Sequence, residues 1–189
     1  MKRRTKQIFI SGIIGIFLIA LTMYLKYRIE GMRTYKDPQH RFTIHYPKKW
    51  EVRQKTAGAD VLFLSPRDGD LDLFRENVSV IVQPLDAQKP HSLSDYSYKA
   101  VNQVTTVFGI NLKVLENNPL AELDGRAAHR FSFIGRGQEG SYKYLMVWTI
   151  NKAQTKAYQI TYAAILAQFD RYEPQVEKML QSFKIKDDQ

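Results

Sequence analysis

The first strong pattern in the chain is an apolar run at residues 8–25, in which no position carries a charge. A helix over this run would be about 27 Å long at 1.5 Å of rise per residue. That length is close to the thickness of the hydrocarbon core of a bilayer. The pattern therefore predicts one transmembrane helix over residues 8–25.

The residues that flank this run predict its orientation. Basic residues crowd the first six positions and favour a cytoplasmic N-terminus: Lys2, Arg3, Arg4 and Lys6. A cleaved signal peptide is the alternative, but its apolar region is usually about 7–15 residues long and ends in a small-residue cleavage site. Here the best candidate site, ending at Thr22, lies inside the run. We therefore expect an uncleaved, single-pass anchor and a domain on the extracytoplasmic side, whether periplasmic, cell-surface or lumenal.

These features divide the chain into segments. We predict a cytoplasmic basic N-terminus at residues 1–7, the anchor at residues 8–25, a tether at residues 26–36, one folded domain at residues 37–186, and a tail at residues 187–189. At 189 residues the chain is long enough for one domain with a sizeable core and an appendage.

After the tether, apolar and polar residues alternate with a period of two, which is typical of half-buried strands. In the first such strand Phe42, Ile44 and Tyr46 share one face, and Pro47 ends it. The segment after Pro47 is expected to continue the same sheet. Further strands are predicted at residues 50–54, 61–65, 77–85, 112–117, 127–134, 142–150 and 157–164. A hairpin loop at residues 151–156 joins the last two.

Two segments show helical spacing instead. Apolar residues recur every three or four positions from Leu93 to Phe108, and Gly109 suits the position just past a helix end. Ser92 and Asp95 have the spacing of a capping box. A second helix follows the last strand, and we expect it to begin only near Glu173, because Pro174 is best tolerated in a first turn. The order of elements predicts an α+β domain with a mainly antiparallel sheet that helices cover.

Composition and charge narrow the function. The chain has no cysteine, which excludes disulfides, thiolate metal sites, a cysteine nucleophile and a lipid-modified cysteine. The net charge is +9, but residues 1–31 contain six basic residues and only one acidic residue. The rest of the chain carries about +4, with its charges interspersed, so we expect no nucleic-acid partner.

Several blocks of the predicted domain resemble the PsbP-like family. "DPQHRFTIHYPKKWEV" at residues 37–52 is similar to the family's opening, in which Asp-Pro precedes a strand that ends in Tyr-Pro and then Trp. "FRENVSVIVQPL" at residues 74–85 and "LDGRAAHRFSF" at residues 123–133 resemble its second and third blocks. Residues 158–185 resemble its C-terminal strand and helix, which ends in Ser-Phe. The resemblance covers about residues 35–186, and its motifs are mostly hydrophobic patterns.

The resemblance implies an α/β/α sandwich around an antiparallel sheet. The plant member of the family is an extrinsic subunit of the oxygen-evolving side of photosystem II. A structural relative, the nuclear-import factor Mog, binds a small GTPase, and many bacterial members are exported lipoproteins. None of these is an established enzyme. This chain differs from the lipoproteins in using an apolar helix as its anchor.

An acidic loop is the first candidate site, with Asp68, Asp70 and Asp72 at every second position. Three carboxylates so close together are either a solvated loop or a weak cation site. An EF-hand that starts at Asp68 would need Gly where Leu73 stands and Glu where Ser79 stands, so that pattern fails. We therefore favour a solvated loop and expect no cofactor. In the alternative interpretation, the three carboxylates would form a site that binds calcium or manganese weakly.

Two further places attract attention. His129 lies on the same strand face as Phe131 and Phe133, which favours a core histidine with a satisfied nitrogen over a ligand. The segment at residues 135–140, "GRGQEG", is predicted to be a flexible hairpin tip rather than a phosphate loop, because it lies between two strands. Its candidate partner contacts are Arg136, Gln138 and Glu139.

No serine nucleophile motif and no phosphate-binding loop occurs in the sequence. We therefore expect no enzyme, but a non-catalytic binding or assembly module that docks on a membrane or envelope complex, with residues 8–25 in the bilayer. One alternative is an extrinsic subunit of the photosystem II type with weak calcium or manganese binding. Another is a small-ligand-binding enzyme that uses the acidic loop. A third is binding of acidic lipid headgroups by Lys48, Lys49, Arg53 and Lys55.

Overall fold

The computed structural model describes residues 31–69, 72, 74–86, 88–89, 91–137 and 140–186. The chain divides into two compact units, Met1–Met32 and Arg33–Gln189, and the second contains the fold. The predicted transmembrane helix at residues 8–25 lies outside the described residues. Within those residues, no helix is both long enough and apolar enough to cross a membrane.

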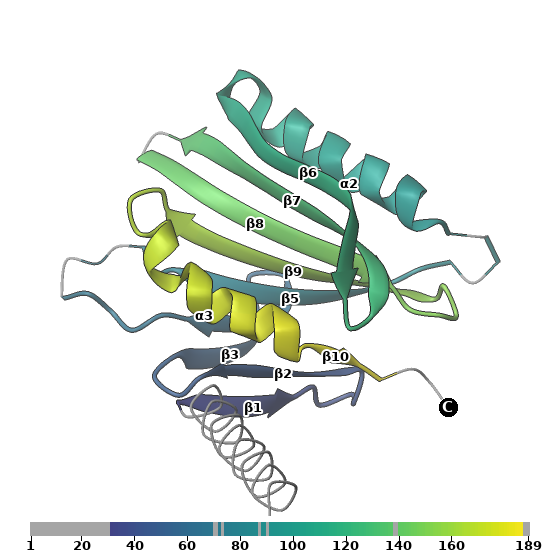
Figure 1. Ribbon diagram of the computed structural model, residues 1–189, viewed down its shortest axis with the longest axis horizontal. Helices are drawn as coiled ribbons and strands as arrows, with labels where there is room; N and C mark the ends of the chain where they lie inside the picture. The colour runs from purple at the N-terminus through teal and green to yellow at the C-terminus, as the bar shows by residue number, and fades with distance from the viewer. Residues whose placement is uncertain are drawn as a thin grey trace, which may run out of the picture. The chain divides into compact units, whose positions relative to one another are not determined.

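A seven-stranded sheet forms the centre of the fold, and every neighbouring pair in it is antiparallel (Figure 1). The predicted α+β class with a mainly antiparallel sheet is thus confirmed. In spatial order its strands are β3 (Glu51–Thr56), β4 (Ala59–Leu64), β5 (Asn77–Pro84), β9 (Lys156–Ile165), β8 (Gly140–Ile150), β7 (Arg126–Gly137) and β6 (Leu112–Leu123).

A second, three-stranded sheet was not expected from the sequence. It contains β1 (Met32–Lys36), β2 (Phe42–Pro47) and β10 (Lys184–Ile185). The prediction that the segment after Pro47 continues the same sheet is therefore wrong. A turn, closed by a 2.9 Å hydrogen bond from Trp50 N to Pro47 O, separates β2 from β3, and the two strands belong to different sheets. Since β1 lies at the end of the predicted tether, the folded domain begins before residue 37.

The two helices cover opposite faces of the large sheet. Residues paired across neighbouring strands share a face, and the pairs Phe131–Met146 and Phe133–Tyr144 lie under α2 (Leu93–Phe108). The alternate residues face α3 (Phe169–Ser182), whose Phe169 ring lies 4.5 Å from the ring of Tyr162 on β9. A short 3₁₀ helix, η1 (Gly109–Asn111), links α2 to β6. Two helical layers on one sheet agree with the sandwich that the resemblance implied.

The helix ends follow the sequence in one case and not in the other. At α2, Ser92 Oγ accepts a hydrogen bond from Asp95 N at 2.9 Å, as the predicted capping box requires. The predicted start of the second helix near Glu173 is wrong, because α3 begins at Phe169 and contains Pro174. Burial of the Phe169 ring and a 2.8 Å bond from Tyr162 Oη to its carbonyl hold the first turn in place. This packing outweighs the single backbone hydrogen bond that a proline cannot donate.

An ion triad ties the turn before β2 to the large sheet. Arg41 donates to both carboxylate oxygens of Asp37, at 2.8 and 2.9 Å, and to Asp60 Oδ1 at 2.6 Å. The second oxygen of Asp60 accepts from Val82 N at 2.7 Å on β5. Burial alone would raise the pKa of Asp37, but hydrogen bonds from Arg41 outweigh it and hold that pKa below its usual value.

The triad predicts acid-sensitive stability. Because the pKa of Asp37 is depressed in the folded state, its contribution is complete above roughly pH 4 and is lost as the pH falls through the lower folded value. Asp37→Asn should destabilise the domain by about 3 kcal/mol at pH 7, and the difference should shrink at pH 3. Urea denaturation at both pH values measures this. Asp86→Asn, which breaks an exposed pair with Lys89, should change stability little, and a pH-independent effect of Asp37→Asn would contradict the prediction.

Gly135 is part of β7 rather than of a flexible tip, and the end of α2 depends on it. A Cβ atom at this position would lie 2.2 Å from the Phe108 ring. That ring is also held against Phe133, at 5.3 Å between centroids, and against Tyr144, at 5.6 Å. Phe108 can therefore close over the sheet only where β7 has no side chain.

Gly135→Ala should therefore destabilise the domain by about 1–3 kcal/mol, because the packed Phe108 ring must shift. Gly137→Ala is the matched control: it lies two residues along the same strand, and the nearest atom to its Cβ is 4.0 Å away. Thermal and urea denaturation compare the two variants. Equal stability would show that Phe108 is free to move.

Candidate functional site

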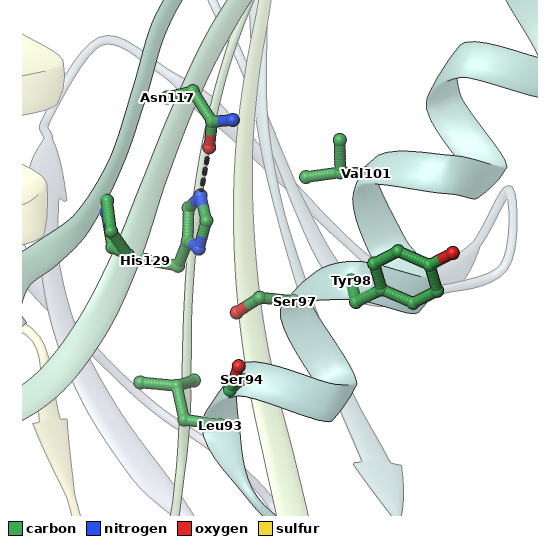
Figure 2. Close-up of a pocket in the computed structure, with 8 residues that line it drawn as sticks. Leu93, Ser94, Ser97, Tyr98, Val101, Asn117 and His129 are labelled. Atoms are coloured by element: carbon green, nitrogen blue, oxygen red, sulfur yellow. Dashed lines mark hydrogen bonds between the residues drawn. The ribbon is translucent and has the colours of Figure 1, made fainter.

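A cleft of about 320 Å³ opens between the first half of α2 and the strands β6 and β7 (Figure 2). Its apolar walls are formed by Leu93, Val101 and Pro119, and Tyr98 lies at its rim with 71% of its surface exposed. Polar side chains supply the rest of the lining: Ser94, Ser97, Asn117 and His129. None of these residues carries a permanent charge.

The indole of Trp148 supports this cleft from below. It is fully buried on β8, and its Nε1–H donates to Ser97 Oγ on α2 at 2.8 Å. The imidazole of His129 stacks on the indole at 4.7 Å between ring centroids, with only 17° between their planes. One aromatic side chain therefore positions both the helix and the histidine.

His129 is 7% exposed and hydrogen-bonded, as predicted for a core histidine. Its Nε2 lies 2.6 Å from Asn117 Oδ1. Figure 2 shows the ring on the strand side of the cleft with this nitrogen directed at Asn117, while Val101 and Tyr98 project from α2. Burial lowers the pKa of His129, so the imidazole is neutral at neutral pH.

Exposed apolar side chains also occur on the elements that line the cleft and on the segment between them. In the described part of the chain, six of the eight exposed large hydrophobic residues lie on α2, η1 and β6. We call these six the α2–β6 seam: Tyr98, Val107, Ile110, Val114, Leu115 and Leu120. Ile110 and Leu120 are almost entirely exposed, at 102% and 88%. The six therefore lie on one consecutive part of the chain, between residues 98 and 120.

The outer edge of β6 is irregular. β6 pairs with β7 alone, at one end of the sheet. Its register shifts between Val114 and Glu116, and again between Asn118 and Ala121 around a proline. Bulges of this kind interrupt the ladder of backbone groups that an added strand would need. A partner at this edge would therefore contact the side chains of the seam more readily than the backbone groups of β6.

The acidic loop is only partly described, since Asp70 lies outside the described residues. Arg171 Nη1 forms an ion pair with Asp68 Oδ2, and Asp72 Oδ2 accepts a hydrogen bond from Asp68 N at 3.1 Å. The described residues contain no cluster of three or more His, Cys, Asp or Glu that could hold a metal ion. The weak calcium or manganese site stays a prediction.

The predicted partner contacts are not part of the cleft. Arg136 is exposed on β7, where it pairs with Ser141, and it lies on the face opposite His129. Gln138 and Glu139 lie outside the described residues. The sequence did not point to Ser97 or Asn117, because a small polar residue on a helix and another on an edge strand carry no spacing signal. Tyr98 did carry a signal, as an aromatic residue off the apolar stripe of its helix.

The fold and the cleft define a two-faced α+β sandwich domain with a partly apolar surface site. A family model described as PsbP matches residues 30–185, so the chain belongs to the PsbP family. No curated protein matches the chain.

Solved structures from a cyanobacterium, a mycobacterium and a yeast have a similar fold. Cyanobacterial PsbP (CyanoP) from Synechocystis sp. PCC 6803 is 20% identical, with a TM-score of 0.59, and the match covers 82% of this chain and 93% of that one. LpqN, involved in cell envelope biogenesis of Mycobacterium tuberculosis, is 10% identical, with a TM-score of 0.64 and coverage of 85% and 94%. The Ran-binding protein Mog1p of Saccharomyces cerevisiae is 10% identical, with a TM-score of 0.56 and coverage of 82% and 95%. At these identities the likeness concerns the fold.

The bond between Trp148 and Ser97 predicts a measurable loss of stability. Ser97→Ala leaves the buried indole N–H without an acceptor, which should cost about 1–3 kcal/mol. Ser94→Ala, one helical turn earlier and exposed, should be neutral or slightly stabilising because alanine is the better helix former. Urea denaturation of the two variants tests this. A neutral Ser97→Ala would mean that the indole finds another partner.

Proposed function

We propose that this protein is a membrane-anchored, extracytoplasmic binding module without catalytic activity, and that it docks on a membrane or envelope protein complex through the α2–β6 seam. The observation that carries the proposal is the seam itself. Exposed apolar side chains occur along one consecutive stretch of chain, from Tyr98 to Leu120, and this stretch includes residues that line the cleft, among them Tyr98 and Asn117. Burial of such a patch against a partner removes apolar surface from water and so favours association.

Relatives with this fold give the proposal a context. Mog1p is a Ran-binding protein, and LpqN is involved in cell envelope biogenesis. Both have a TM-score above 0.5 with this chain over more than four-fifths of its length. A binding role for the present domain is consistent with these two relatives, although a shared fold does not by itself specify a function.

The anchor proposal rests on the sequence. The uncharged run at residues 8–25 is long enough to span a bilayer, and the basic residues before it favour a cytoplasmic N-terminus. A domain tethered in this way stays close to the membrane surface, which raises its effective concentration toward other membrane proteins. Even a weak contact at the seam would then be occupied.

The geometry favours docking by side chains over addition of a strand. β6 offers an edge, but its bulges and the proline at position 119 break the regular pattern of donors and acceptors. The other edge strand, β3, presents charged and polar residues, among them Glu51 and Arg53. We therefore expect the partner to contact α2 and β6 through apolar side chains rather than to add a strand to the sheet.

The test uses the full-length chain in its native membrane. Replacing Val107, Ile110 and Leu120 by serine should reduce recovery of the chain in a larger crosslinked complex at least about tenfold, which corresponds to 1.4 kcal/mol of binding. Thermal stability should stay unchanged, because these side chains are exposed. Crosslinking followed by size separation measures the complex.

Ile165→Ser with Leu166→Ser is the control, since both residues are exposed and apolar but lie away from the seam, Ile165 at the end of β9 and Leu166 in the turn before α3. This variant should retain the complex. Equal loss in both variants, or in neither, would contradict docking through the seam.

A further inference from the structure

The cleft beside Tyr98 is suited to one side chain rather than to a cofactor. Its volume of about 320 Å³ is at the lower end of the range for small-molecule sites. Leu93, Val101 and Pro119 supply apolar walls, while α2 contributes the hydroxyls of Ser94 and Ser97 and the strands contribute Asn117 and His129. A compact group with an apolar body and one polar atom would match this division.

The hydrogen bond of His129 determines which polar atom fits. Asn117 Oδ1 can only accept, so His129 Nε2 must carry the proton and donate to it. In the neutral ring Nδ1 is then an acceptor. Within the described residues, His129 Nδ1 makes no hydrogen bond, and Ser97 Oγ accepts one, from the indole N–H of Trp148.

We propose that this cleft binds an aromatic side chain that carries a hydrogen-bond donor, an indole or a phenol, presented by the protein partner, with His129 Nδ1 as the acceptor. The inference rests on the proposed docking function and names the group that the partner would insert. Aromatic anchors in pockets commonly supply a large share of the binding energy at protein interfaces.

The chemistry of the lining argues against other occupants. A carboxylate or an ammonium group would lose its hydration and find no opposite charge among the lining residues. The nearby carboxylate of Asp95 is engaged by Ser92, at 2.6 Å. An aliphatic group would leave Nδ1 without a donor. An aromatic ring can also pack against the exposed ring of Tyr98 at the rim.

Matched amino-acid amides can test the donor requirement on the full-length chain in detergent or nanodiscs. N-acetyltryptophanamide and N-acetyltyrosinamide should bind with about fivefold higher affinity than N-acetylphenylalaninamide, which lacks the donor, because one hydrogen bond contributes about 1 kcal/mol. Histidine-selective ¹⁵N NMR should report a saturable shift at His129 Nδ1. Equal affinities for the three probes, tighter binding of N-acetyllysinamide, or no saturable shift up to the solubility limit would overturn the proposal.

Two substitutions on α2 test the location. Ser94→Trp places a large ring in the mouth of the cleft and should abolish probe binding, whereas Asn102→Trp places the same ring on an exposed position of the same helix and should not. Circular dichroism and thermal denaturation should show that both variants fold. Probe binding that survives Ser94→Trp would overturn the assignment to this cleft.

The same pair separates this inference from the docking function. If the inference holds, Ser94→Trp should also reduce the crosslinked complex at least about tenfold, while Asn102→Trp preserves it. A complex that depends on the seam but survives Ser94→Trp would refute the insertion of an aromatic side chain into the cleft. It would leave docking through the seam intact. Probe binding in the cleft without any effect of the seam substitutions would support the cleft as a binding site and refute docking through the seam.

Discussion

The hydrogen bond from Trp148 to Ser97 is the interaction on which the site depends. The indole is buried in the large sheet, so its N–H needs an acceptor, and α2 supplies one at 2.8 Å. This bond fixes the first half of the helix over β7 and β8. The face of the same ring supports His129. The cleft therefore exists because a core aromatic residue holds its two sides together.

A second constraint ties the turn before β2 to the large sheet. Arg41 joins Asp37, in the turn before β2, to Asp60 on β4, and Asp60 in turn accepts from the backbone of β5. The small sheet and α3 thus share one face of the large sheet, through contacts such as the stacked rings of Phe42 and Phe183. On the other face, α2 covers β7 and β8, and six exposed apolar side chains lie on α2, η1 and β6.

Much of the fold could be predicted from local signals. The period of two along residues 127–134 placed His129, Phe131 and Phe133 on one face, and all three are buried there. The capping pair at Ser92 marked the start of α2 correctly, because a cap depends only on neighbouring residues. The start of α3 could not be predicted in this way. Phe169 begins that helix through its contact with Tyr162, which comes from a different element.

The sequence by itself determined β2 and the strands of the large sheet, the antiparallel α+β class, the family and the core position of His129, because these follow from periodicity and from motifs that are local in the chain. Only the tertiary structure decided that β2 leaves the large sheet, since a strand pattern does not say which neighbour it pairs with. It also decided the site. Ser97, Asn117 and His129 come from three elements. They lie close together because of the register of β6 with β7 and the position in which α2 packs over Trp148. Contacts of that kind arise from packing between distant segments, which no spacing along the chain encodes.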